Sequence, residues 1–526
     1  MKNINYLLLF GLSMAFLNAS SQNTQWVMSS PQDSQIVVSD MAGNSNKSVF
    51  LFKQTNGTFT WSTLNFWVER YDMPSMKKIY EKKIEGTEEE GGKGKSLIID
   101  NAYSLKQGVI VIAISNDSRT AYAMLLNSDD GSLKDGKKLT LAEINPQIEG
   151  EISLKFEVSK DGSSLIMYYV SSSSPVIHTM CIDANLTIKW KKDIMPSFSN
   201  SDFTIVQVFS KDGNEIAMLA SVNDSINKHN IDYVFLYYNF TGNISFETPL
   251  YLDTGEKITS FRMGIDNAAN PVICGKYLVD GNKNQLTGGV YGIRIDAKSG
   301  KILAQATTEF TDEFEAKMMS ESTSRRDLNP YLRINYIGIT PANDIIISLE
   351  RIEKMSCGGS TGFNGGHNIN SGPTINISHE YNYYVYYYKD LVFAKLNSQT
   401  LKPEWMTIIP KKGFSGGVVN KSYGVTIQGD SATVMFCDNI KNASLSPKKL
   451  NEDANNLKEY KFDKEGKNLS ITICKVDLKS GNQKRNYFTN PKAERTTLNF
   501  NPLHLVNFPD VYVFNVADAQ TTGTDE

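Results

Sequence analysis

The stretch Tyr291-Gly-Ile-Arg-Ile-Asp-Ala-Lys-Ser-Gly-Lys-Ile-Leu303 predicts an alternating strand, an Asp/Gly turn and the start of a second strand. Versions of this unit recur around Asp72, Asn127, Asp183, Asn239, Asn397 and Asp477. From the first of these turns to the one at Asp296 the spacings are 55, 56, 56 and 57 residues, and the next two are 101 and 80. A period of this kind in a strand-rich chain indicates one supersecondary unit repeated as a propeller or solenoid.

A second feature precedes each of these turns, namely a polar turn followed by an apolar run. Examples are Lys160–Tyr169, Lys211–Leu219, Asn270–Cys274, Asn343–Ser348 and Asp430–Phe436. Together the two features predict four antiparallel strands per unit, which is the composition of a propeller blade. Continuous apolar runs such as Ile345–Ile347 predict inner strands covered on both faces, whereas Lys77–Lys83 alternates with charge as an outer edge strand does.

Two known kinds of repeat resemble these units. The segment from Phe203 to Ala217, which contains Ser-Lys-Asp-Gly, resembles the repeats of TolB-type, WD40-like propellers. Tyr291–Leu303 and Met180–Trp190 resemble the strand-turn-strand of quinoprotein-like repeats. Both resemblances imply blade geometry. The tryptophan docking position of quinoproteins is occupied in just two units, by Trp190 and Trp405, so no quinone or other cofactor is predicted.

The predicted fold class is therefore all-β, a closed β-propeller of four-stranded antiparallel blades. Seven copies of the repeated turn predict seven blades. A final strand pair, Leu503–Phe508 and Val511–Val516, is expected to join N-terminal strands near Gln25–Met28 and Gln35–Val38. If that pair instead completes a separate blade, the alternative count is eight.

The first 20 residues have the pattern of a secretory signal peptide. Lys2 precedes the apolar run Tyr6–Leu17, and small residues follow at Ala19–Ser21. The chain is therefore expected to be exported, to the periplasm or the cell exterior, with residues 21–526 forming a single propeller domain. The later apolar stretch Tyr383–Leu396 is interrupted by charged residues, so no membrane span is predicted.

Charge and cysteine content exclude several classes of partner and site. The formal net charge is -3 and the basic residues are dispersed, so nucleic-acid binding is not predicted. The five cysteines are odd in number and lack CxxC spacing, which argues against a disulfide scaffold and a zinc cluster. A disulfide between Cys437 and Cys474 is the one alternative kept, because both residues are expected on neighbouring strands. The Asn127–Asp135 stretch is interpreted as a hairpin turn rather than a calcium loop.

Three insertions interrupt the repeat, at about residues 312–330, 356–388 and 439–468. The second joins a Gly/Asn/Ser-rich loop to a tyrosine cluster, a composition that suits ligand contact. Its candidate ligand-binding residues are His367, Asn368, His379, Tyr381, Tyr383 and Tyr386. The alternative is that tyrosines at alternate positions pack between blades. Two histidines twelve residues apart are weak evidence for a metal, so no metal site is predicted.

These observations predict a binding or scaffold module for a protein partner or a glycan, with no catalytic residues identified. The alternative is a propeller hydrolase or lyase that acts on polysaccharide or peptide, with groups from different blades converging at the central channel. A channel-mouth pocket that brings together carboxylates, or tyrosine, arginine and histidine, would favour the enzyme. The oligomeric state is left open by the sequence.

Overall fold

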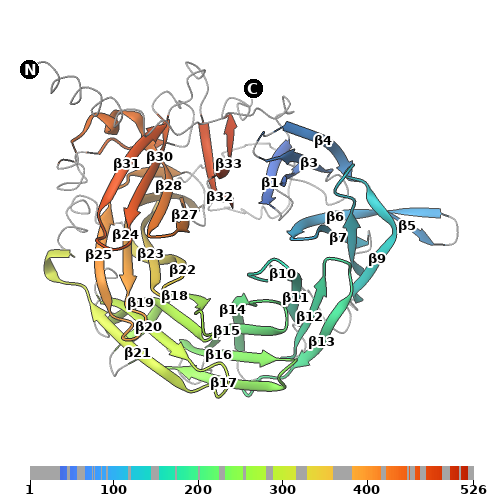
Figure 1. Ribbon diagram of the computed structural model, residues 1–526, viewed down its shortest axis with the longest axis horizontal. Coiled ribbons are helices and arrows are strands. Elements are labelled where there is room, and N and C mark those ends of the chain that lie inside the picture. Colours follow the sequence, from blue (N-terminus) through green and yellow to red (C-terminus); the bar gives the residue numbers. More distant parts are fainter. Residues whose placement is uncertain are drawn as a thin grey trace, which may run out of the picture.

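The computed structural model describes residues 36–43, 48–55, 65–73, 75, 77–84, 86–90, 93–115, 120–143, 153–171, 175–198, 202–223, 231–252, 256–279, 288–314, 329–358, 382–415, 422–446, 449, 457–461, 469–488, 498–508 and 511–518. These residues are nearly all in β-strands, and the sheets are arranged around a common centre (Figure 1). In this part of the chain, seven sheets contain a four-stranded antiparallel blade. The predicted seven-bladed β-propeller is thereby confirmed.

The blades follow one another along the chain. The first is β1 (Ile36–Gly43), β2 (Ser48–Thr55), β3 (Phe66–Asp72) and β4 (Lys77–Ile84), and the second is β5 (Gly86–Glu90), β6 (Lys93–Leu105), β7 (Gly108–Ser115), β8 (Thr120–Leu126) and β9 (Leu133–Glu143). The third is β10 (Lys155–Val158), β11 (Ser164–Val170), β12 (Ile177–Asp183) and β13 (Ile188–Ile194). The fourth is β14 (Asp202–Phe209), β15 (Glu215–Asn223), β16 (Ile231–Asn239) and β17 (Ile244–Leu250).

The remaining blades keep this order, with one addition. The fifth is β18 (Glu256–Ile265), β19 (Pro271–Val279), β20 (Gly289–Ile295) and β21 (Ile302–Glu309). The sixth is β22 (Asn329–Ile339), β23 (Ile345–Gly358), β24 (Asn382–Leu396) and β25 (Pro403–Ile409), extended by the short strands β26 (Gly413–Ser415) and β29 (Tyr460–Lys461). The seventh is β27 (Tyr423–Gln428), β28 (Ser431–Asn439), β30 (Leu469–Asp477) and β31 (Gln483–Phe488), with a 3-10 helix, η2 (Ile440–Ser444), after β28.

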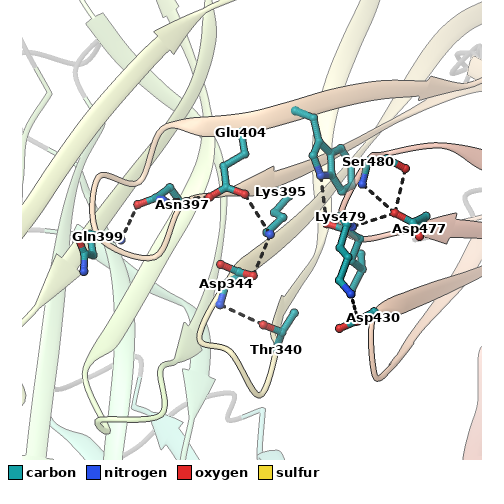
Figure 2. Close-up of polar contacts among 12 residues, drawn as sticks. Thr340, Asp344, Lys395, Asn397, Gln399, Glu404, Asp430, Asp477, Lys479 and Ser480 are labelled. Atoms are coloured by element: carbon teal, nitrogen blue, oxygen red, sulfur yellow. Dashed lines mark hydrogen bonds and ion pairs between the residues drawn. The ribbon is translucent and has the colours of Figure 1, made fainter.

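The recurring Asp or Asn turns lie between the third and fourth strands of each blade, where the spacing predicted them. Figure 2 shows two of these turns. The Asn397 Oδ1 atom accepts hydrogen bonds from the backbone N–H groups of Gln399, at 2.9 Å, and of the following threonine, at 3.0 Å. The Asp477 Oδ1 atom accepts in the same way from Lys479, at 3.0 Å, and from Ser480, at 2.8 Å. These side chains are therefore used by the turn itself, as expected.

The core lies between adjacent blades. In β23, Ile345 and Ile347 pack against the fifth blade, whereas Ile346 packs against the seventh. All three side chains are fully buried, which contributes about 1.5–3 kcal/mol each. This confirms the prediction of inner strands covered on both faces. The outer strand β4 is mostly exposed, as its alternating charge predicted.

Tryptophans in the fourth strands of two blades form hydrogen bonds to the following blade. The Trp190 Nε1–H group donates to the carbonyl oxygen of Gly213 at 2.7 Å, and the Trp405 Nε1–H group donates to that of Leu478 at 3.2 Å. Gly481 has a positive φ of 72°, and a Cβ atom there would lie 2.9 Å from the Trp405 ring. The indole therefore lies directly on a turn of the next blade.

Other aromatic side chains occupy the same place where tryptophan is missing. Tyr80 of the first blade lies on Gly131 in the turn of the second, and Phe246 of the fourth blade lies on Gly300 in the turn of the fifth. Ring-on-glycine packing is thus more widespread than the two tryptophans indicated. The packing requires a flat side chain above a residue without Cβ, which several aromatic residues satisfy.

The last two strands differ from expectation. Strands β32 (Leu498–Phe508) and β33 (Val511–Asp518) pair with each other in a sheet of their own, beside β1 and β27, instead of joining the first blade. Figure 1 shows this pair between the seventh blade and the first. The reason is that β1 to β4 already supply four strands to the first blade. The expected N-terminal strand near 25–28 and the expected signal peptide, residues 1–20, lie outside the described residues.

Four cysteines, Cys181, Cys274, Cys437 and Cys474, are buried and form no disulfide with one another. Cys437 lies opposite Ile471 and Cys474 lies opposite Val434, so the two cysteines are three positions apart in the ladder. An odd offset places their side chains on opposite faces of the sheet. The possible Cys437–Cys474 bridge is therefore excluded by register. Separately, the described residues contain no helix with the length and apolar character needed to cross a bilayer.

Candidate functional site

A cavity of about 560 Å³ is lined by strands of the fourth, fifth and sixth blades, among them the innermost strands β14, β18 and β22, which face the centre of the ring (Figure 1). We call it the channel pocket. Its polar lining residues are Ser221, Tyr233, Thr259, Ser260, Arg262, Lys276 and Arg333. The lining contains no carboxylate and no histidine among the described residues. Its volume is typical of sites for small ligands, which span roughly 300–1,000 Å³.

β-Bulges shape this pocket. The pairing of β14 with β15 and of β18 with β19 each shifts register by one residue, at Val206 and Thr259. Both bulged residues line the pocket. A bulge bends its strand and redirects the side chains on either side of it, and bulges are frequent beside functional sites. The strand β22 has the same shift at Asn335.

Two arginines and Lys276 supply the positive charges of the channel pocket. Arg262 of β18 and Arg333 of β22 come from adjacent inner strands, which are close enough for the Ile334 N–H group to donate to Ser260 Oγ at 3.4 Å. Burial, and in addition the positive charge of Arg333, lower the pKa of Arg262. The Arg262 guanidinium donates to the carbonyl oxygen of Phe261 at 3.2 Å. Within the described ranges, no carboxylate lies within 4 Å of either guanidinium.

The remaining polar groups of the pocket are hydroxyls. Tyr233 packs edge-on against Phe261, with ring centroids 4.9 Å apart, and burial raises the pKa of its phenol above the ordinary value of 10.0. Thr259 Oγ1 donates to the carbonyl oxygen of Lys276 at 3.1 Å. Because Tyr233 keeps its proton at neutral pH, the described lining offers donors and cations but no evident proton acceptor for general-base chemistry.

Acidic residues lie on the other side of the channel. Asp100 of β6 and Glu157 of β10 belong to inner strands that face β18 and β22 across the ring centre in Figure 1. Surrounding protein desolvates both carboxyls, although both residues are exposed at the surface. This raises the pKa of Asp100 and raises that of Glu157 to about 7. Lys155 is also exposed on β10, so the inner strands of the second and third blades carry charges of both signs.

A buried ionic network lies behind the pocket, in the sixth blade. Lys411 Nζ is 2.7 Å from Glu350 Oε1, and neither side chain is exposed. The Ser422 hydroxyl contacts both groups, and Asn335 Nδ2 donates to Glu350 Oε2 at 3.1 Å. The ammonium also lies 5.8 Å from the ring centroid of Tyr388. Every member of this network has a partner, as buried charges require.

A second set of buried charges adjoins the first. Arg351 pairs with Glu353, and it also lies 3.8 Å from Asp390 Oδ2. Lys389 Nζ is 2.9 Å from Glu353 Oε2. The backbone N–H group of Lys411 donates to Asp390 Oδ1 at 3.3 Å, which links the two sets. Together they hold the base of the β23–β24 hairpin.

That hairpin carries the sequence-predicted site, in part. Strand β24 contains Tyr383 opposite Cys357 and Tyr386 opposite Lys354, so both tyrosines lie on an extension of the sheet. His367, Asn368, His379 and Tyr381 lie outside the described residues, and the predicted loop site stays a prediction. Tyr388 is buried, which agrees with the packing alternative for that residue.

Sequence reasoning missed Arg262 and Arg333. Neither arginine belongs to a sequence motif. They line the same cavity because the first strands of the fifth and sixth blades are neighbours in the ring. The available signal was an arginine in the first strand of two successive units. Without the register of the bulged strands, that signal did not show which way either side chain pointed.

No family model matches this chain. No curated protein matches it either. Solved structures with propeller folds do match. The WD40 domain of SCAP from fission yeast shares 11% identity, covering 89% of this chain and 94% of that chain, with a TM-score of 0.36. The β-propeller domain of the Trilobed protease from Pyrococcus furiosus shares 7% identity, covering 88% and 99%, with a TM-score of 0.37. Polysaccharide lyase Uly1 shares 10%, covering 89% and 95%, with a TM-score of 0.38. The likeness concerns the WD40-like propeller fold alone.

Proposed function

We propose that this protein is an exported binding module whose ligand, a glycan or a group on a protein partner, enters the channel pocket. The observation that supports it is the pocket itself, which is of ligand size and contains two guanidinium groups that lack carboxylate partners among the described residues. A pocket with convergent polar groups is the general form of a ligand site.

The enzyme alternative has one observation in its favour, since tyrosine and arginine do share the pocket. Against it, the raised pKa of Tyr233 disfavours a phenolate base. A lyase would convert an acidic polysaccharide into unsaturated products that absorb ultraviolet light, and a hydrolase would release reducing ends. Detection of either product with purified protein would replace the binding proposal with the enzyme.

A blocking variant tests where the ligand binds. Val206 lines the pocket and is 47% exposed, so Val206→Trp adds bulk without removing a hydrogen bond. Val279 is 39% exposed at the end of β19 and does not line the pocket, so Val279→Trp is the matched control. On glycan and peptide arrays, Val206→Trp should lose the ligands that wild type and Val279→Trp retain.

Two further results would count against the proposal. If both tryptophan variants keep the same ligands, the binding site lies elsewhere, and the 356–388 insertion becomes the next candidate. If a chain that retains residues 1–20 stays in the cytoplasmic fraction of the host, the export part of the proposal is wrong.

A further inference from the structure

The lining of the channel pocket contains three cationic side chains, those of Arg262, Lys276 and Arg333. Arg262 and Arg333 line the same cavity, and no carboxylate of the described residues lies within 4 Å of either guanidinium. Two like charges in a partly desolvated cavity repel each other and lose hydration. A bound anion would remove both costs, because a guanidinium fork forms paired hydrogen bonds with carboxylate and similar oxyanions.

We propose that this arginine pair binds the acidic group of an anionic glycan, either the carboxylate of a uronate or a sulfate ester. The inference rests on the proposed function and names the ligand chemistry of the same pocket. The remaining lining explains the choice of a glycan. The Ser221 hydroxyl can donate and accept, Thr259 Oγ1 can still accept, and Ser260 Oγ can still donate. The aromatic ring of Tyr233 belongs to the same lining.

Calorimetric titration of the full-length protein tests this assignment. The probes are oligogalacturonate, its methyl ester, dextran sulfate, dextran and polyglutamate. We expect binding of oligogalacturonate or dextran sulfate, whichever anion is the source, and no binding of the methyl ester or of dextran. Arg262→Gln and Arg333→Gln should each weaken that binding roughly 10- to 150-fold. Arg262→Lys should give an intermediate loss, because it keeps the charge but not the fork.

A control variant separates a specific site from general charge. Lys301 is exposed just before β21 of the fifth blade, so Lys301→Gln removes one positive charge far from the pocket lining and should leave the affinity unchanged. Without ligand, Arg262→Gln should melt at or above the wild-type temperature, because none of the described residues gives this arginine an acidic partner to lose. A clearly lower melting temperature would assign Arg262 a structural role and overturn the inference.

Other outcomes also decide the matter. Equal binding of the methyl ester, binding of polyglutamate alone, no binding of any anionic glycan, or unchanged affinity in both arginine variants would each overturn the inference. If Val206→Trp abolishes binding of neutral glycans or peptides on the arrays, the proposed function stands and only the anionic assignment fails.

Discussion

Replacing Lys411 with methionine should destabilise the protein strongly, because it leaves a buried carboxylate without its cation. The Lys411 ammonium lies 2.7 Å from Glu350 Oε1, and both side chains are fully buried. The contacts left to Glu350 are neutral donors, namely the Ser422 hydroxyl and backbone N–H group and the Asn335 amide at 3.1 Å. Removal of one partner from a buried ion pair costs about 3–5 kcal/mol. We therefore expect Lys411→Met to lower the free energy of unfolding by that amount.

Lys395 provides a matched comparison in the same blade. Its ammonium lies 2.9 Å from Asp344 and 3.0 Å from Glu404, as Figure 2 shows, but these carboxylates are 22% and 37% exposed. Water can hydrate them after Lys395→Met, so that variant should lose about 1 kcal/mol or less. Urea unfolding at 25 °C of wild type and both variants measures the two differences.

The double variant Lys411→Met/Glu350→Met tests the cause of the loss. It removes the stranded charge, so it should be more stable than Lys411→Met alone. It still leaves the Asn335 amide without an acceptor, at a cost of about 1–3 kcal/mol, so it should remain less stable than wild type. A Lys411→Met loss no larger than that of Lys395→Met would show that the buried pair is not formed as described.

Two other predictions concern the blade contacts and the channel wall. Gly481→Ala should destabilise by about 1–3 kcal/mol more than Gly429→Ala in urea, because both glycines have positive φ but only at Gly481 does the new Cβ meet an indole ring; equal losses would refute the ring-on-glycine contact. Burial raises the pKa of Glu157 in the folded state from 4.5 to about 7. Between these pH values the folded state binds more protons than the unfolded state, so the free energy of unfolding falls as the pH rises. Glu157→Gln should remove this part of the fall, and melting curves with unchanged pH dependence would contradict the desolvation of this carboxyl.

The blades could be predicted from the sequence because their signals are local. In turns such as those of Asn397 and Asp477, the side-chain oxygen accepts hydrogen bonds from backbone N–H groups two or three residues ahead. Such turns can therefore be predicted from the sequence without knowledge of the fold. The last strand pair was misplaced for the opposite reason. Whether β32 joins β1 depends on how many strands the N-terminal segment already supplies, which is a property of the whole ring.

The buried charges of the sixth blade were also missed, although the sequence holds a trace of them. In β23 the apolar run Ile345–Ile347 is followed by Glu350, Arg351 and Glu353, and a strand covered by neighbours does not tolerate such residues without partners. The partners include Lys411 and Ser422, which follow later in the chain and, like Glu350, are charged or polar residues with no motif around them. Only the three-dimensional register shows that these groups meet.

Strand β23 connects the features that the sequence and the structure pointed to separately. Its Glu350 lies opposite Arg333 of the channel pocket. Its Lys354 lies opposite Asn329 on one side and, on the other side, opposite Tyr386, a residue of the predicted loop site. Four residues of strand separate these two levels, about 13 Å at 3.3 Å per residue. The buried network at Glu350 and Lys411 fixes the strand between them. The pocket and the hairpin therefore lie at two levels of the same sheet, with the buried charges of β23 between them.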